Sequence, residues 1–298
     1  MSARTPVQNR IEKVTLPKAL NYSLITLLAV MCALPLVLVI MVSISSETAI
    51  KLNGYQLVPS AFSFSAYRMI FSPRSSVIPA YGISGLVTVT GTLIATLITG
   101  MAAYTLANRN VAKRNTLAIM FFVPMVFNAG LVPWYMMCRT LGLTDNILAL
   151  IVPSLMFSPF NMFLCRNFMR TIPESLLESA KLDGATDVTI AIRIYFPLSL
   201  PVLATVTLFY GVAYWNDWFN AIMLVNNYKL FPLQYMLYRL QSEIAALQRL
   251  DPSVPVADLP GEALKMATTV VTIGPIVFLY PYLQKYFVRG LIIGGVKG

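Results

Sequence analysis

The chain lacks histidine altogether, and this absence removes several classes of enzyme at once. Zinc sites of the HExxH type, histidine-ligated haem and Ser-His-Asp triads all need a histidine side chain. Cysteine is scarce too: Cys32, Cys138 and Cys165 lie in or beside apolar runs, without the spacing of a metal site. We expect them to act as small apolar side chains, and we expect no metal site and no catalytic residues.

Charged residues are also few. They make up 11% of the 298 residues, whereas about 25% is usual in a soluble domain, and 57% of the residues are apolar. A phosphate-binding loop is missing as well: the nearest match to GxxxxGK[ST] is GLIIGGVKG at the C-terminus, where the spacing and the final residue are both wrong. The composition therefore predicts a membrane protein that does not bind ATP itself.

Six apolar segments are long enough to cross a bilayer, since about twenty helical residues span its hydrocarbon core. They lie at residues 19–45, 81–107, 116–138, 146–165, 196–225 and 263–287. The first is too long for the core of a signal peptide and is expected to remain as a span. The pattern predicts an all-α polytopic membrane protein with six transmembrane helices within residues 19–287.

Lysine and arginine indicate the orientation of these spans. If the N-terminus is inside, fourteen of the 22 basic residues fall in inner segments. These inner segments are residues 1–18, 108–115, 166–195 and 285–298. The positive-inside rule thus favours a cytoplasmic N-terminal segment, 1–18, and a cytoplasmic C-terminal tail, 288–298. It also accounts for most of the net charge of +10 without a nucleic-acid partner.

Two expected outer segments, 46–80 and 226–262, are long enough to have structure of their own. In the second, Leu233, Met236 and Leu237 begin a series of apolar residues at helical spacing. We expect an amphipathic helix there, on the outer surface, followed by an irregular loop over residues 251–260.

Residues 171–195, called the charged segment below, carry six charges between two apolar segments. Each charge at the bilayer centre would cost about 2.5–3.5 kcal/mol, so the segment must lie in water or against a protein. Thr171 and Glu174 have the spacing of a capping box, which predicts a helix from this point. Gly184 suits a left-handed helix end, after which Thr186 or Asp187 can cap a second short helix.

Ala180 and Gly184 lie four residues apart, so their small side chains are expected to share one face and to admit another backbone. On the residues alone, two interpretations stay open: a docking element on the cytoplasmic face, or an ordinary solvated loop between two spans.

A motif in this segment resembles a known one. Glu178, Ser179 and Ala180 are followed after three residues by Gly184 and after nine more by Ile194–Pro197. This resembles the EAA motif of ABC importer permeases, written EAA, x3, G, x9, I-x-L-P. Serine replaces the second-position alanine and Phe196 replaces the leucine, and both changes keep a small or apolar side chain.

Two further stretches, Tyr210–Val225 and Gln284–Gly298, are similar to the carbohydrate subfamily of type I ABC importer permeases. The resemblance covers nearly the whole chain and implies the six-span fold of that family, in the bacterial inner membrane. Within the family the chain also resembles permeases that import alginate. The resemblance implies a sugar or an oligosaccharide as the substrate, with alginate as one candidate.

The resemblance also implies a set of partners and roles. A separate ATPase dimer binds ATP and Mg²⁺, a second permease subunit, expected to be a different chain, completes the path, and an extracytoplasmic binding protein delivers the carbohydrate. The EAA helix docks on the ATPase and transmits its closure to the spans. The expected coupling residues are Glu178, Ser179, Ala180, Gly184, Ile194 and Pro197.

Polar and aromatic residues within the spans are candidates for the substrate path. They are Trp215, Asn216, Trp218, Asn128 and Asn161. Aromatic faces and amides suit a sugar, but an aromatic belt at the headgroup level explains the tryptophans equally well, and the asparagines can bond a neighbouring helix. Asp217 is the only acidic residue in an expected span and is not predicted as a ligand.

The sequence gives less support to two other functions. An ion-coupled secondary sugar carrier normally buries ionisable groups near the bilayer midplane, and these spans hold almost none. An intramembrane enzyme would need histidine or paired intramembrane aspartates, which are missing.

Overall fold

The computed structural model of the chain describes residues 16–72, 77–153, 155–250, 261–275 and 277. Within these ranges all regular secondary structure is helical, and the only β-type pairing is an isolated bridge between Ser45 and Phe62. The mostly helical fold is therefore confirmed. The expected tail 288–298, the loop 251–260 and most of the segment 1–18 lie outside the described residues.

The chain divides into two compact units, of which the first comprises Met1–Tyr67 and Ala257–Val270. It contains α1 (Leu16–Ser43), α2 (Glu47–Asn53) and the start of a helix over residues 262–275. The carboxylate of Glu47 accepts hydrogen bonds from the backbone N–H groups of Glu262 and Ala263, at 3.2 and 3.1 Å. Glu47 thus caps the helix that begins at residue 262.

A second set of contacts surrounds Glu262. Its carboxylate pairs with Lys265 at 2.7 Å and accepts a hydrogen bond from the Tyr55 hydroxyl. Lys265, followed by Tyr55, lowers the pKa of Glu262, and the hydrogen bond to Glu262 raises the pKa of Tyr55 to about 12. At pH values above the ordinary pKa of glutamate, ionised Glu262 therefore stabilises this unit. The stabilisation is lost as the pH falls through the lowered pKa of Glu262.

The second unit comprises Arg68–Val256 and Val271–Gly298, and α3 (Ser65–Ile70) lies at the boundary. Its helices are α4 (Val77–Ala107), α5 (Arg114–Val126), α6 (Leu131–Thr140), α7 (Leu148–Ile151), α8 (Pro159–Met169), α9 (Glu174–Leu182), α10 (Asp187–Ile190), the π-helix η1 (Ala191–Tyr195), α11 (Phe196–Leu198), α12 (Leu200–Trp215), α13 (Phe219–Leu224), the 3-10 helix η2 (Tyr228–Leu230) and α14 (Leu233–Leu250). The amphipathic helix expected in the segment 226–262 is confirmed as α14, whose Leu233 and Leu237 are buried.

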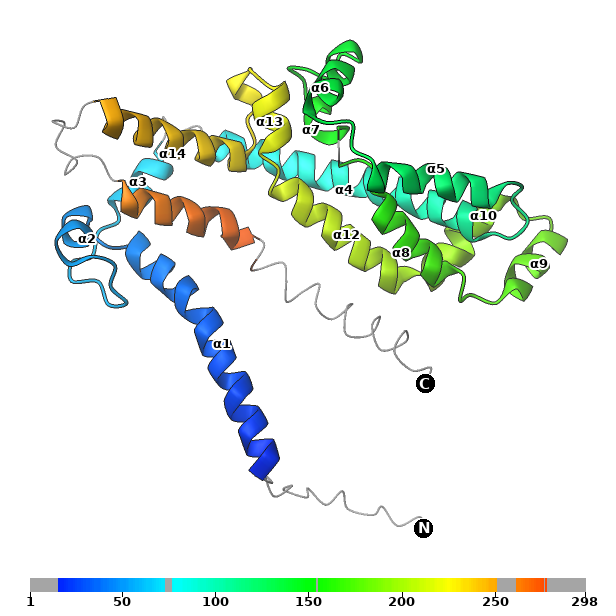
Figure 1. The fold of residues 1–298 in the computed structure, drawn as a ribbon, viewed down its shortest axis with the longest axis horizontal. Coiled ribbons are helices and arrows are strands. Elements are labelled where there is room, and N and C mark those ends of the chain that lie inside the picture. Colours follow the sequence, from blue (N-terminus) through cyan, green and yellow to red (C-terminus); the bar gives the residue numbers. More distant parts are fainter. Residues whose placement is uncertain (1–15, 73–76, 154, 251–260, 276, 278–298) are drawn as a thin grey trace, which may run out of the picture. The chain divides into compact units, whose positions relative to one another are not determined.

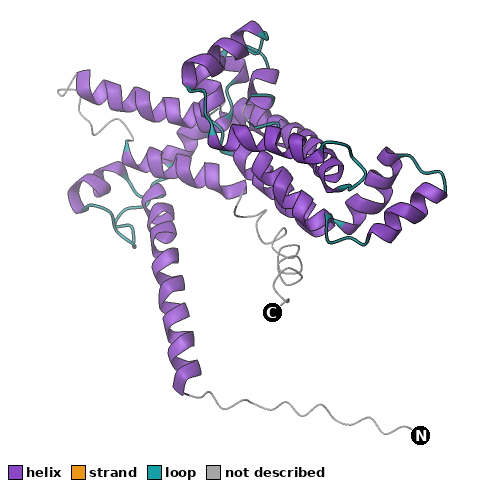
Figure 2. Cartoon of the chain, turned by 45° about the vertical axis from the view of Figure 1, so that its right-hand side comes forward, coloured by secondary structure: helices purple, strands orange, loops and turns teal. Residues whose placement is uncertain are grey.

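The core of the second unit lies where α4 packs against α8 and α12, which are labelled in Figure 1 and shown turned by 45° in Figure 2. Two glycines of α4 make the contact close: the ring of Tyr214 fills the space beside Gly91, and the ring of Phe196 fills the space beside Gly100. The Tyr214 hydroxyl donates to the carbonyl of Ile151 at 2.8 Å, which fixes the ring in place. Small residues that admit a neighbouring helix in this way are typical of packing between membrane helices.

Two helices in the described part of the chain are long and apolar enough to cross a membrane. They are the stretch Leu20–Ser43 of α1 and the whole of α4, Val77–Ala107. Two bent pairs, α5 with α6 and Asp187–Leu198 with α12, raise the number to four if each pair is one span. The six spans and their orientation are not confirmed; the last expected span, 263–287, is described only to residue 277.

The bends occur where the sequence interrupts the backbone hydrogen bonds. α5 and α6 meet at 117°, across residues that include Gly130 with a φ of +88°. The bend before α12, 88°, lies at Ser199. Pro201 has no N–H to offer the carbonyl of Pro197, so the helix cannot continue straight through this point. The expected span 146–165 is also interrupted: α7 and α8 are separate helices, because Pro153 and Pro159 flank the residues between them.

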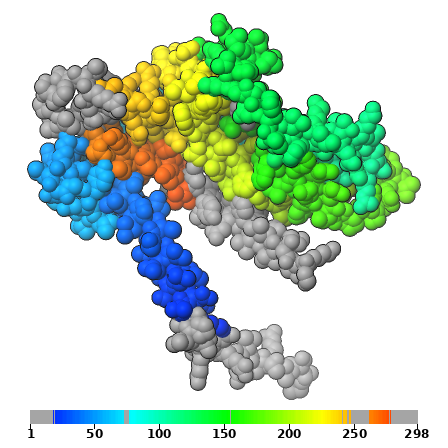
Figure 3. All heavy atoms as spheres, in the orientation of Figure 1, coloured from blue at the N-terminus to red at the C-terminus, as the bar shows by residue number. Residues whose placement is uncertain are grey.

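Several helices in the described part of the chain have apolar surfaces that nothing covers, and α1 and α6 are two of them. Nearly all of α1 is exposed, with Leu20 at 75%. α6 projects from the rest of its unit (Figure 3) and exposes Val132 and Met137. Such surfaces need lipid or another protein to cover them.

Candidate functional site

The charged segment forms α9, α10 and η1 at one end of the second unit (Figure 1). The predicted capping box at its start is wrong. α9 begins only at Glu174, and the Thr171 hydroxyl instead donates to the carbonyl of Phe168 at 2.8 Å. Ile172 precedes a proline and so disfavours the helical conformation, which leaves Thr171 outside the helix that it was expected to cap.

The turn between the two short helices follows the prediction. Gly184 has a φ of +78°, its N–H donates to the carbonyl of Lys181 at 3.0 Å, and the N–H of Ala185 donates to that of Ala180 at 3.0 Å. These two bonds define a Schellman ending. The Thr186 hydroxyl then accepts from the N–H of Thr189 at 3.3 Å and caps α10.

The six motif residues differ in exposure. Those open to solvent are Glu178, Ser179, Gly184 and Pro197. Ile194 is half-buried and Ala180 is buried, so the expected open face of two small residues, Ala180 and Gly184, does not form. A Cβ atom at residue 184 would meet nothing within 4 Å. Within this chain, therefore, the glycine serves the turn and not a close contact.

An apolar surface accompanies the exposed motif residues. Leu182 is 89% exposed, Val188 is 55% exposed and Ile192 is 49% exposed, one on each of α9, α10 and η1. Glu178 lies in the same segment, and its carboxylate has no hydrogen bond or ion pair among the described residues. The combination of uncovered leucine, valine and isoleucine with a free carboxylate is suited to contact with another protein.

Side chains from the last turn of α4 and from the turn after it reach this segment. Arg109 pairs with Glu174 at 3.1 Å, and the Tyr104 hydroxyl donates to Oδ1 of Asp187 at 3.3 Å. Lys181 also pairs with Asp187, at 3.5 Å. Sequence reasoning missed Tyr104 and Arg109 because their partners lie more than sixty residues away along the chain. It also missed the pair of Lys181 and Asp187, which forms only because the turn at Gly184 brings the two short helices together.

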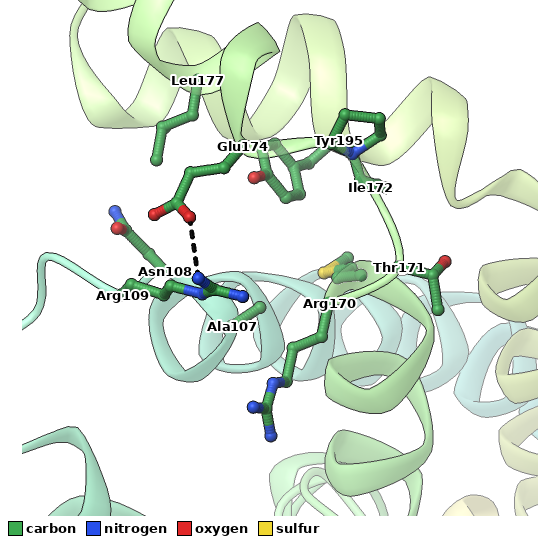
Figure 4. A pocket seen from close by; sticks show the side chains of 11 residues that line it. Ala107, Asn108, Arg109, Arg170, Thr171, Ile172, Glu174, Leu177 and Tyr195 are labelled. Atoms are coloured by element: carbon green, nitrogen blue, oxygen red, sulfur yellow. Dashed lines mark ion pairs between the residues drawn. The ribbon is translucent and has the colours of Figure 1, made fainter.

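A cavity of about 250 Å³ lies between these elements (Figure 4). Its wall includes Asn108 and Arg109 after α4, Arg170 and Thr171 after α8, and Glu174 at the start of α9. In Figure 4 the Arg109 and Glu174 side chains meet across it, whereas the Arg170 side chain points away from Glu174. The cavity is thus the gap that the ion pair bridges.

Two expected path residues are engaged in contacts within the chain. The Trp215 indole N–H donates to the carbonyl of Thr272 at 3.0 Å, and its ring lies 6.0 Å from that of Tyr81. The Asn216 amide donates to the carbonyl of Val212 at 2.9 Å and accepts from Gln234 at 3.2 Å. Both side chains therefore have structural roles in the described part of the molecule.

Trp218 differs from Trp215 and Asn216 because its side chain is exposed to solvent. It is 42% exposed and stacks on Tyr238 of α14, with ring centroids 5.1 Å apart and an interplanar angle of 21°. Arg239 follows Tyr238, is 52% exposed at its side chain and pairs with Glu243. The Arg239 guanidinium lies over the ring of Phe231, 5.6 Å from its centroid. An exposed aromatic stack has the chemistry to bind the apolar face of a sugar, and an exposed guanidinium on the same helix has the chemistry to bind a carboxylate.

The two remaining candidates, Asn128 and Asn161, and the acidic residue Asp217, which is not predicted as a ligand, occupy different surroundings. The Asn128 side-chain oxygen accepts from the N–H of Gly130 at 2.8 Å and serves the break between α5 and α6. Asn161 is buried in α8, with 6% exposed. Asp217 accepts from the N–H groups of Phe219 and Asn220, so this carboxylate caps α13. The structure does not bring these residues together with Trp218 into one site.

No group of three or more cysteine, aspartate and glutamate side chains in the described residues is arranged to hold a metal ion. Cys138 and Cys165 are buried, as expected of small apolar residues, whereas Cys32 is exposed on α1.

Comparison with known proteins identifies the family. Residues 93–293 match the family model of the binding-protein-dependent transport system inner membrane component. The polygalacturonan/rhamnogalacturonan transport system permease protein YtcP of Bacillus subtilis is 35% identical over 280 residues, which are 94% of this chain and 97% of the relative. Protein LplC of the same organism is 36% identical over 269 residues, or 89% of each chain.

A solved structure agrees with these matches. The crystal structure of a bacterial ABC transporter involved in the import of the acidic polysaccharide alginate contains a chain that superposes with a TM-score of 0.79 and 29% identity. The match covers 95% of this chain and 100% of that one. Since the family model and two relatives above 30% identity span most of the sequence, this chain belongs to the family of binding-protein-dependent transport system inner membrane components, as a carbohydrate permease of the type I ABC importers.

Proposed function

We propose that this chain is one of two permease subunits of an ATP-driven importer of acidic oligosaccharides, and that the charged segment docks on a separate ATPase. The observation that carries the docking is the exposure of Leu182, Val188 and Ile192 beside the free carboxylate of Glu178. Exposed apolar residues in a segment with six charges are costly in water and gain stability when another protein covers them.

A cysteine cross-link tests this docking. With Cys32 replaced by serine, Leu182→Cys is expected to cross-link to the ATPase subunit of the assembled transporter, because the side chain at residue 182 is 89% exposed. The matched control is Ser242→Cys on α14, also exposed and expected on the opposite side of the membrane. The readout is the shifted band on a denaturing gel, identified by mass spectrometry.

Two results would contradict the docking. One is the absence of any cross-link from residue 182 in a complex that hydrolyses ATP. The other is an equal cross-link from residue 242, which would also overturn the six-span topology with both termini inside.

The proposed substrate is an oligosaccharide of uronic acids. The relatives named for polygalacturonan and for alginate handle polymers rich in carboxylates, and the described spans of this chain have no cations deep within them. Arginine and lysine of outer loops must then meet the substrate charge, and Arg239 of α14, whose side chain is 52% exposed, is one candidate. Trp218 replaces Trp215 and Asn216 as the favoured path residue, since the latter two are engaged within the chain.

Competition in proteoliposomes tests the substrate class. Uptake of a labelled alginate oligosaccharide by the complete transporter is expected to fall with unlabelled uronate oligosaccharides and to stay unchanged with neutral ones. Trp218→Ala is expected to lower uptake per assembled complex roughly two- to tenfold, the range that aromatic contacts of about 0.5–1.5 kcal/mol allow. Equal competition by neutral sugars would remove the acidic preference and leave the permease assignment standing.

A proton- or sodium-coupled sugar carrier is not favoured. The family and the relatives are transport permeases that depend on binding proteins, and the alginate protein is described as an ABC transporter.

A further inference from the structure

The last turn of α4 and the turn directly after it contact the first residue of each short helix in the charged segment. Arg109 pairs with Glu174, where α9 begins, and Tyr104 donates to Asp187, where α10 begins. Lys181, in the last turn of α9, pairs with the same Asp187 and so links the two helices to each other. One helix end thus contacts both halves of the segment.

The contact at Tyr104 is packed as well as polar. Tyr104 is only 4% exposed, and its ring meets that of Tyr195 edge-on, with centroids 4.9 Å apart at 71°. Tyr195 belongs to η1, the third element of the charged segment. Movement of α9, α10 or η1 therefore acts on a buried side chain that is in contact with η1.

The covalent routes out of the charged segment are less direct. Toward α12 the chain passes through the π-helical turn η1 and the 88° bend at Ser199, and toward α8 it passes through the non-helical residues around Ile172. α4 is by contrast one continuous helix of 31 residues, which is roughly 46 Å at 1.5 Å per residue. A straight helix of that length carries a displacement across a bilayer, whereas a bend absorbs part of it.

We infer that α4 receives the movement of the charged segment through Tyr104 and Arg109, which act as positioning residues for transport. The inference rests on the proposed docking of the ATPase and adds the element that takes up its motion. Both contacts bind the short helices at their first residues, so a tilt of α9 or α10 pulls on the end of α4. α4 in turn packs on α12 at Gly91 and on α11 at Gly100, and it also packs on α8.

A charge exchange tests the contact at Arg109. In the complete transporter, Arg109→Glu and Glu174→Arg are each expected to lower the amount of sugar imported per ATP hydrolysed, on the order of two- to fivefold. The double variant restores the ion pair with reversed charges and is expected to recover most of the loss. In Arg109→Glu, which lies outside the charged segment, ATPase association should stay unchanged, because exposed ion pairs contribute little to stability.

Lys113→Glu is the matched control. Lys113 lies in the same loop as Arg109 and is exposed, and it has no ion pair among the described residues. Lys113→Glu is expected to import as much sugar per ATP hydrolysed as the wild type. Tyr104→Phe removes only the hydroxyl, keeps the ring on Tyr195, and is expected to lower the ratio with little change in thermal unfolding.

The probes are labelled alginate oligosaccharide and a labelled neutral oligosaccharide, and the ratio is measured with whichever the wild type imports. Two results would overturn the role of α4 while the cross-link from residue 182 stands. One is that Arg109→Glu and Tyr104→Phe import as much sugar per ATP hydrolysed as the wild type. The other is that the double variant imports no more sugar per ATP than the single variants. If the wild type imports neither sugar and residue 182 does not cross-link, the proposed function fails and this inference fails with it.

Discussion

Replacing Gly184 by valine is expected to lower transport roughly fivefold or more, a larger effect than any other single change in the charged segment. The residue has a φ of +78°, where a β-branched side chain is strained by roughly 1–2 kcal/mol. That energy shifts a local equilibrium about five- to thirtyfold. The Schellman ending would then open, and α9 and α10 would lose the fixed angle at which they present Leu182 and Val188.

Gly184→Asn is the control for this effect. Asparagine tolerates the left-handed conformation, and a Cβ atom at this position meets nothing within 4 Å in the chain itself. We expect Gly184→Asn to keep most of the transport and the association with the ATPase. Wild-type transport in Gly184→Val would refute the importance of the turn, and equal loss in both variants would show that the docked partner needs the space.

Gly91→Ala is expected to destabilise the second unit by roughly 1–3 kcal/mol, the usual cost of overpacking. A Cβ atom at residue 91 would lie 2.5 Å from the ring of Tyr214. The ring cannot withdraw easily, because Tyr214 is 2% exposed and its hydroxyl is bonded to Ile151. Thermal unfolding of the purified chain and the yield of assembled transporter measure the loss.

The matched control is Gly85→Ala in the same helix. A Cβ atom there meets nothing within 4 Å, so the substitution brings only the gain of about 0.5–1 kcal/mol that alanine has over glycine in a helix. We expect Gly85→Ala to be as stable as the wild type or slightly more so. If Gly91→Ala unfolds at the same temperature as Gly85→Ala, the close packing of α4 on α12 is not what limits stability.

Periodicity and spacing were sufficient for the local features. The glycine turn at Gly184, the Thr186 cap and the amphipathic helix α14 all form as the sequence predicts. Each depends on residues within one or two turns of each other, so the local pattern contains the whole interaction. The capping box at Thr171 failed for a local reason that was also visible in the sequence, the proline at residue 173.

The contacts of the candidate path residues were beyond such reasoning. Trp215 and Asn216 are adjacent to Trp218 in a stretch that reads as one aromatic and amide cluster. Tertiary packing gives them different surroundings. Trp215 is hydrogen-bonded to Thr272 and Asn216 to Gln234, whereas Trp218 stacks on Tyr238 and remains exposed to solvent. Their partners lie between eighteen and 57 residues away, and no spacing rule connects positions so far apart.

The sequence by itself determined the chemical class of this protein: an apolar, helical chain without histidine or a phosphate loop, with the EAA-like motif in its one strongly charged segment. Those properties depend on composition and on short-range spacing, which the order of residues fixes directly. Only the tertiary structure decided which surfaces stay open and which helix the charged segment contacts. Tyr104 and Arg109 became recognisable once folding had brought α4 against α9 and α10, because burial and ion pairing depend on distances in space and not along the chain.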